Sequence, residues 1–196
     1  MTLPTKSTET MHLTRRDLLR GMAGASLLLL APAFIRSASG AAFAAAPSRA
    51  IAFNNLHTGE SCALTYFEQG QYVPESLAII NRVLRDHRNN EEHAMDVALL
   101  DLLTMLHGEL HTSAPFEVIS GYRSPESNAA MHARSEGVAK HSMHMEGKAM
   151  DIRVSDRSLT QLHRTALAMG AGGVGYYPTS NFVHVDTGRV RQWQGV

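Results

Sequence analysis

The 196-residue sequence has one cysteine and no excess of either charge. A single cysteine, Cys62, excludes an intramolecular disulfide, and its alternating surroundings predict a small core residue. Eighteen Lys and Arg residues balance eighteen Asp and Glu residues, which argues against a strongly basic nucleic-acid-binding protein. An apolar fraction of 44% excludes a disordered chain, which would be poor in apolar residues. The sequence therefore indicates a folded protein without a nucleic-acid partner.

Long hydrophobic runs are also missing. The apolar run over residues 21–35 carries no charge and has 15 residues, fewer than the roughly 20 that cross a bilayer as a helix. Arg15 and Arg16 precede this run, and small residues with A-x-A cleavage candidates follow it. A basic segment, then an apolar run, then small residues is the order found in a secretory signal peptide. The arginine pair resembles a twin-arginine signal. We predict a signal peptide over residues 1–46, with a retained membrane anchor as the alternative.

The remaining residues, 47–196, have the length of one domain. After removal of the leader no second stretch could span a membrane, so we expect a periplasmic protein, exported by the twin-arginine route. We expect it to be a monomer.

Hydrophobic periodicity predicts an α+β fold for this domain. Two short apolar runs separated by a polar turn predict a β-hairpin, and apolar residues at helical spacing predict several helices. The expected strands are 49–56, 62–67, 116–119, 148–154, 172–176 and 182–186, and the expected helices are 74–90, 94–111, 126–135 and 159–169. Together they indicate a single domain with a small, mostly antiparallel sheet and helices packed on it.

The residues that carry chemistry lie in the C-terminal half of the sequence. His144 occupies an irregular stretch, and Asp151 follows on the next predicted strand. On the last predicted strand, His184 and Asp186 are two residues apart, so both side chains leave the same face of the sheet. Two imidazoles and one carboxylate form a three-ligand zinc set that keeps a fourth position for water. Spacing alone leaves open a structural His/Asp hydrogen bond instead of a metal.

A family resemblance runs through the predicted domain. Residues 142–151 read Ser-x-His-x-x-Gly-x-Ala-x-Asp, which resembles the zinc-binding signature of the M15-type peptidases, a group that includes D-Ala-D-Ala peptidases and phage endolysins. The nearer resemblance is to the exported DUF882 proteins, the group of murein endopeptidase K, and it extends to residues 54–60, 120–124 and 172–178. The resemblance implies the M15/hedgehog-type zinc peptidase fold and a zinc-dependent peptidase that acts on peptidoglycan stem peptides. It also implies zinc bound by His144, Asp151 and His184.

Amide hydrolysis needs further groups beside the metal. Arg123 follows a predicted strand and matches the arginine that stabilises the oxyanion in this family; its alternative role is to brace the loop. Many M15 peptidases place an acid three positions before the last histidine ligand, where this chain has Asn181, which cannot accept a proton. We predict Asp186 as the general base, with Glu146 and His141 as alternatives. Asp186 could instead orient a ligand imidazole.

Tyrosines and glycines near these segments have weaker assignments. Tyr122, Tyr176 and Tyr177 are candidates for a substrate groove or for packing. The glycine-rich run 172–175 lacks the helix and lysine of a phosphate-binding loop, so it is expected to allow a close approach of strand and substrate.

The leading function is an exported, zinc-dependent murein endopeptidase that cleaves peptide cross-links. One alternative is a D,D- or L,D-carboxypeptidase that trims stem peptides, and another is a non-catalytic cell-wall binding module with a structural metal. A metal-storage role is disfavoured, because the histidines are scattered along the chain.

Overall fold

A computed structural model describes residues 47–135 and 137–195 of the chain. The predicted signal peptide, residues 1–46, lies outside the described residues. None of the helices in the described part combines the length and the apolar character that crossing a membrane requires.

Eight strands form one sheet in the order β3-β2-β1-β4-β5-β7-β6-β8. Their bounds are β1 Arg49–Asn55, β2 Ser61–Glu68, β3 Gln71–Tyr72, β4 Phe116–Ser120, β5 Ala149–Val154, β6 Gly173–Tyr177, β7 Phe182–Asp186 and β8 Arg191–Gln194. The pairs β1–β4 and β6–β8 are parallel, and the other pairs are antiparallel. The sheet is therefore mixed, and larger than the small, mostly antiparallel sheet expected. The two unexpected strands, β3 and β8, are too short to produce a periodic pattern in the sequence.

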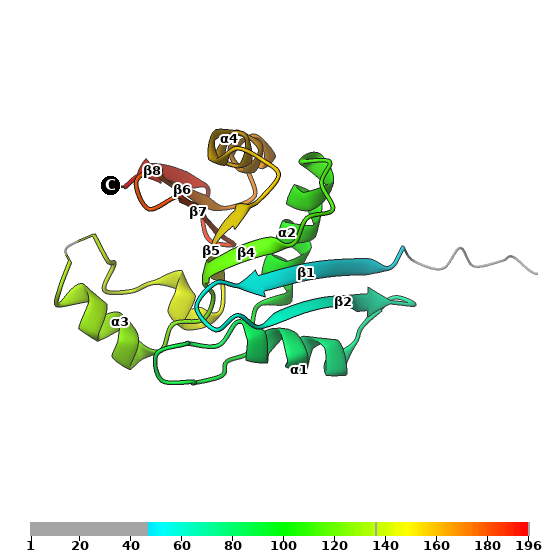
Figure 1. Cartoon of the computed structure of the whole chain (residues 1–196), viewed down its shortest axis with the longest axis horizontal. Helices are drawn as coiled ribbons and strands as arrows, with labels where there is room; N and C mark the ends of the chain where they lie inside the picture. The colour runs from blue at the N-terminus through cyan, green and yellow to red at the C-terminus, as the bar shows by residue number, and fades with distance from the viewer. Residues whose placement is uncertain (1–46, 136, 196) are drawn as a thin grey trace, which may run out of the picture. The chain divides into compact units, whose positions relative to one another are not determined.

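The helices confirm the α+β class. Within the described residues they are α1 Pro74–Val83, α2 Val97–Glu109, α3 Pro125–His132 and α4 Leu159–Met169, with a short 3₁₀ helix, η2, at Met143–Glu146. Figure 1 shows α1 alongside β2, and α4 beside β6 and β7. Helix α3 lies apart from α1 and α4. Helices α1, α2 and α4 pack against the sheet, and α2 also contacts α4.

Alternate residues of the strands fill the core under these helices. Phe53, Phe116, Ile152 and Val183 come from four neighbouring strands, and each is fully buried. Helix α2 adds five buried leucines, Leu99, Leu100, Leu102, Leu103 and Leu106. Because successive side chains of a strand point to opposite faces, the intervening residues of β5 and β7 are left for the other face of the sheet. That face carries the candidate site.

Helix α1 ends at Val83, earlier than the predicted helix over 74–90. The reason is Asp86, whose buried carboxylate accepts hydrogen bonds from the backbone N–H groups of Arg88 (3.0 Å) and Ser124 (2.9 Å). A carboxylate that captures a backbone N–H two residues ahead favours a turn over a helix. The same carboxylate fastens this turn to the segment that follows β4.

Candidate metal centre

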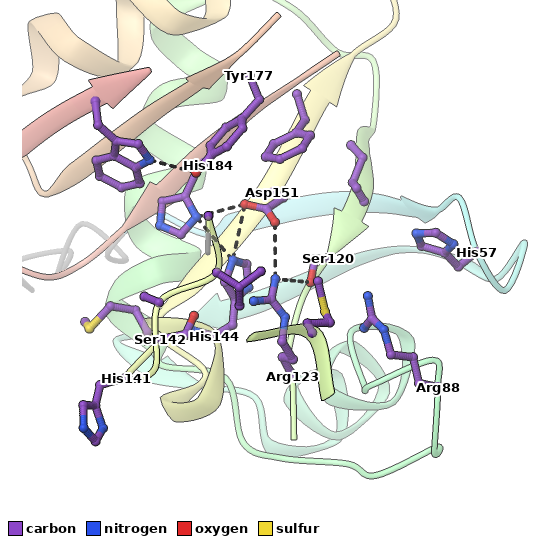
Figure 2. A pocket seen from close by; sticks show the side chains of 18 of the residues that line it. His57, Arg88, Ser120, Arg123, His141, Ser142, His144, Asp151, Tyr177 and His184 are labelled. Atoms are coloured by element: carbon purple, nitrogen blue, oxygen red, sulfur yellow. Dashed lines mark hydrogen bonds and ion pairs between the residues drawn. The ribbon is translucent and has the colours of Figure 1, made fainter. Parts of the chain in front are cut away.

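The structure brings the three predicted metal ligands together. Asp151 on β5 lies directly opposite His184 on the antiparallel strand β7, and η2 carries His144 to the same point. Asp151 Oδ1 is 2.9 Å from His184 Nδ1 and 3.3 Å from His144 Nε2, and the two imidazole nitrogens are 3.2 Å apart. One ligand atom from each residue lies within 4.8 Å of the others, and all three side chains are buried. Figure 2 shows these groups converging.

Hydrogen bonds on the outer side of each imidazole fix which nitrogen faces the cluster. His144 Nδ1 donates to the carbonyl oxygen of Gly121 at 2.7 Å, so its Nε2 presents a lone pair. His184 Nε2 donates to Asp186 Oδ2 at 2.9 Å, so its Nδ1 presents a lone pair. Two imidazole lone pairs and one carboxylate oxygen aimed at one point suit a divalent cation such as zinc, and outer-shell partners of this kind are usual for histidine ligands.

Burial and mutual contacts shift the pKa values of all three residues of the cluster. Burial lowers the pKa of His144 and would raise that of Asp151, but the contacts of Asp151 with His144 and His184 leave its pKa well below the usual range. Burial also acts to lower the pKa of His184, but the hydrogen bonds to Asp151 and Asp186 outweigh it and raise that pKa. The cluster thus holds an ionised carboxylate at its centre, as a cation site requires.

Local sequence explains the position of His144. Ser142 caps η2 by accepting a hydrogen bond from the backbone N–H of His144 (3.4 Å). Gly147 ends the helix with φ +64°, and a Cβ there would lie 2.5 Å from the carbonyl oxygen of Ala94. Only glycine meets both demands, so this residue sets the angle at which the chain passes from η2 into β5.

A β-bulge shapes the neighbouring strand. In β4 the pairing with β5 shifts between Val118 and Ser120, so that Ser120 lies opposite Asp151. Strict alternation would have pointed Ser120 toward the core, together with Phe116 and Val118. The extra residue turns Ser120 toward the site, a common use of bulges near functional residues.

Arg123 lies beside the cluster with few firm contacts. Its Nη2 is 3.8 Å from Asp151 Oδ2 and 3.5 Å from Ser120 Oγ, and its Nη1 is 3.4 Å from Asn128 Oδ1. Among the residues that the structure describes, its buried Nε has no hydrogen-bond partner. Burial lowers the pKa of the guanidinium, which still titrates far above neutral pH. These long contacts leave N–H groups available to another oxygen, which a residue that only braces the loop would not need.

Asp186 lies behind His184, on the side away from the cluster. Its carboxylate is fully buried and accepts hydrogen bonds from His184, from Arg191 Nη1 (2.9 Å) and Nη2 (2.6 Å), and from the backbone N–H groups of Gly173 (3.1 Å) and Gly188 (2.8 Å). Burial acts to raise its pKa, but the hydrogen bonds from His184 and Arg191 outweigh it and lower that pKa. A carboxylate with this many donors is a poor proton acceptor. The geometry favours the alternative role, in which Asp186 orients a ligand imidazole.

The glycine-rich segment 172–175 leaves space for the side chains of Asp186 and Trp193. A Cβ on Gly173 would lie 2.5 Å from Asp186 Oδ2, and one on Gly175 would lie 2.6 Å from the ring of Trp193. The glycines therefore make room for side chains of β7 and β8, which is a different close approach from the expected contact with substrate. Sequence reasoning missed Arg191 and Trp193, because both lie on the short strand β8.

The other candidate bases lie elsewhere. Glu146 is exposed and pairs with Lys148 Nζ at 2.8 Å, and it does not line the pocket around the cluster. His141 lines that pocket, but Figure 2 shows its ring pointing away from the ligands. Asn181, in the turn between β6 and β7 with φ +56°, lines a separate surface depression.

The cluster opens into a pocket of about 410 Å³. Tyr177, Phe182 and Trp193 form an aromatic wall: the Tyr177 and Phe182 rings stack with centroids 4.4 Å apart, and Trp193 Nε1 donates to Tyr177 Oη at 2.8 Å. Of the three tyrosines expected at a groove, Tyr177 alone lines the pocket. Tyr122 is buried, and the ring of Tyr176 stacks on a histidine of α4.

Comparisons with known proteins find relatives over most of the chain. The family of M15-type peptidases described as peptidoglycan L,D-endopeptidase MepK matches residues 43–193. The chain is 45% identical over 181 residues to the peptidoglycan L,D-endopeptidase MepK of Escherichia coli strain K12, which covers 91% of this chain and 96% of that protein. It is 42% identical over 149 residues to the probable peptidoglycan L,D-endopeptidase MepK of Haemophilus influenzae, which covers 76% of this chain and 80% of that protein.

Proposed function

This chain belongs to the family of the peptidoglycan L,D-endopeptidase MepK, and we propose that it is a zinc-dependent endopeptidase that hydrolyses peptide cross-links of peptidoglycan. The observation that carries the proposal is the convergence of His144, Asp151 and His184 beside Arg123 in one pocket. A non-catalytic wall-binding module would need the metal ligands but not a buried guanidinium with unused N–H groups.

His144, Asp151 and His184 would hold the metal through Nε2, a carboxylate oxygen and Nδ1. Zinc bound by three protein ligands supplies a Lewis acid that makes water nucleophilic near neutral pH. The outer hydrogen bonds to Gly121 and Asp186 keep both imidazoles in the tautomers that ligation needs.

Arg123 supplies the fixed positive charge for the oxyanion that develops on the scissile carbonyl. Its N–H groups reach Asp151 and Ser120 only at 3.5 Å or more, so a carbonyl oxygen brought into the pocket can compete for them. We assign Asp186 as the residue that positions His184. The proton acceptor is then another group, and His141 is the pocket-lining candidate, provided that its ring turns toward the ligands.

Residues 1–46 are proposed to export the enzyme to the periplasm as a twin-arginine signal peptide, where its substrate lies. Replacing Arg15 and Arg16 together by lysine should retain the precursor in the cytoplasm. Unchanged export, measured by fractionation, would argue against this route.

The experiment that tests the function is mass spectrometry of purified cross-linked muropeptide dimers incubated with the protein and zinc. The wild type should convert dimers into monomers, and His144→Ala and a chelated sample should not. The fragment masses identify the bond and distinguish 3-3 from 4-3 cross-links. Release of a free terminal amino acid would indicate a carboxypeptidase, and intact dimers with zinc-loaded protein would indicate a binding module.

A further inference from the structure

The pocket extends past Arg123 to a second arginine that the proposed chemistry does not use. Arg88, from the turn after α1, lines the same pocket, as does His57 from the β1–β2 turn. Figure 2 shows Arg88 and His57 on one side of Arg123 and the three metal-ligand candidates on the other. Asp151 is the acidic residue of the lining, against three arginines. The residues that line this pocket therefore carry an excess of positive charge.

The backbone of Arg88 is held firmly. Its N–H donates to the buried carboxylate of Asp86 at 3.0 Å, and the same carboxylate accepts from the backbone of Ser124, next to Arg123. Gly121 makes a second attachment, since a Cβ there would lie 2.5 Å from the carbonyl oxygen of Leu84. Two segments distant in sequence are thus locked together, and their arginines are presented to one pocket.

The guanidinium of Arg88 is far less committed than its backbone. Within the described part of the chain its one partner is Asp86 Oδ1, 3.3 Å from Nη1, and its side chain is 33% exposed. Arg191, by contrast, makes two short hydrogen bonds to Asp186. A guanidinium has five N–H donors, so most of those of Arg88 remain for a ligand.

His57 forms a preorganised wall beside Arg88. Asn55 fixes its turn by accepting from the backbone N–H of His57 at 2.9 Å and donating to the carbonyl of Val83 at 2.7 Å. The His57 ring stacks on His87 with centroids 3.9 Å apart and planes 9° apart. This end of the pocket is therefore built from fixed turns.

We propose that Arg88 is a specificity-determining residue that binds a free carboxylate of the substrate next to the scissile amide. This inference rests on the proposed endopeptidase function. An arginine fork with unused N–H groups binds a carboxylate through two parallel hydrogen bonds, which neither a carboxamide nor a lysine reproduces. The enzyme then selects cross-linked peptides that keep a free carboxylate next to the scissile amide over those in which that group is amidated.

The test uses two synthetic cross-linked peptides that differ only in this group, carboxylate or carboxamide. Their kcat/KM values are measured with the zinc-loaded wild type, Arg88→Gln and Arg88→Lys. The wild type should prefer the carboxylate by about ten- to a hundredfold, the usual contribution of a charged hydrogen-bonded pair. Arg88→Gln should bring this ratio near one by losing activity on the carboxylate peptide alone, and Arg88→Lys should give an intermediate ratio.

The matched control is Arg164→Gln, which removes a positive charge from the exposed side of α4 and should keep the wild-type ratio. Equal zinc content and circular dichroism of all variants would show that the fold is retained. Equal losses of Arg88→Gln on both peptides, or a wild type that cleaves both equally well, would overturn the inference. A wild type that cleaves neither peptide would refute the underlying endopeptidase function, and the inference with it.

Discussion

The two ends of the pocket are built in different ways. At the ligand end, His144, Asp151 and His184 come from η2 and two paired strands and are 2–8% exposed. At the other end, Arg88 and His57 come from turns, and the Arg88 side chain is 33% exposed with one long contact. The backbone is fixed at both ends, but only the ligand end fixes the functional atoms themselves.

This difference separates two tasks of an enzyme. Chemistry needs ligand atoms held to within a fraction of an ångström, which strands and outer hydrogen bonds provide. Selection of a substrate group needs donors that stay uncommitted until the substrate arrives. Substitutions at the ligand end should therefore abolish activity on every substrate, and those at the Arg88 end should change only which substrate is preferred.

The largest effect is expected from His144→Ala. Loss of one of three ligands should remove the metal and lower activity by about a thousandfold or more, because the Lewis acid contributes several kcal/mol to the transition state. Zinc content by atomic absorption and kcat/KM on muropeptide dimers measure both. A variant that keeps full activity without metal would refute the zinc assignment.

The matched control for this variant is Val183→Ala, next to His184 on β7 but pointing into the core. Val183 is fully buried, so its truncation should cost about 2 kcal/mol in the free energy of unfolding. Zinc content should stay at the wild-type level. The pair of variants thus separates an effect on stability from an effect on metal binding.

The next largest effect is expected at Arg123, between the two ends. Arg123→Ala should lower kcat by about a hundred- to a thousandfold, the usual loss when an oxyanion donor is removed, while zinc content stays unchanged. Arg123→Lys should recover part of the rate, because it keeps the charge. An unchanged kcat with lowered stability would instead assign Arg123 to bracing the loop.

A smaller effect is expected from Asp186→Asn. An outer partner of a ligand imidazole contributes about ten- to a hundredfold in metal affinity or activity, so added zinc should restore much of the activity. The acidic limb of the pH–rate profile should persist. Loss of that limb without rescue by zinc would reinstate Asp186 as the general base.

The sequence was most informative about features that residues close together in the chain determine. Period two on the strand 182–186 places His184 and Asp186 on one face, and their 2.9 Å hydrogen bond confirms it. The hairpin at 49–67 follows from its polar turn and the helix at 159–169 from its apolar spacing, and both are confirmed. Local pattern is sufficient for such features because neighbouring residues determine them.

The sequence was least informative where distant segments meet. Nothing in the local pattern shows that Asp86 attaches the Arg88 turn to Ser124, or that β8 brings Arg191 onto Asp186. The assignment of Asp186 as the general base rested only on its sharing a face of the sheet with His184. Besides His184, its donors are Arg191 on β8, the backbone N–H of Gly173 at the start of β6 and that of Gly188 after β7, which only the folded chain brings together.

The smallest effect is expected at the Arg88 end, in the pH dependence of stability. Burial, together with the nearby charges of Arg88 and His57, lowers the pKa of His87 to about 4, from an ordinary value near 6.5. Between these two pH values the unfolded chain binds a proton that the folded chain does not, so stability falls as the pH drops through this window. His87→Gln should flatten the decline in Tm between pH 6.5 and 4, while His141→Gln, which removes an exposed imidazole, serves as the control. If the slope of Tm against pH is unchanged in His87→Gln, the stack of His57 on His87 opens in solution. The Arg88 end of the pocket would then lack its preformed wall and would not differ from an ordinary surface turn.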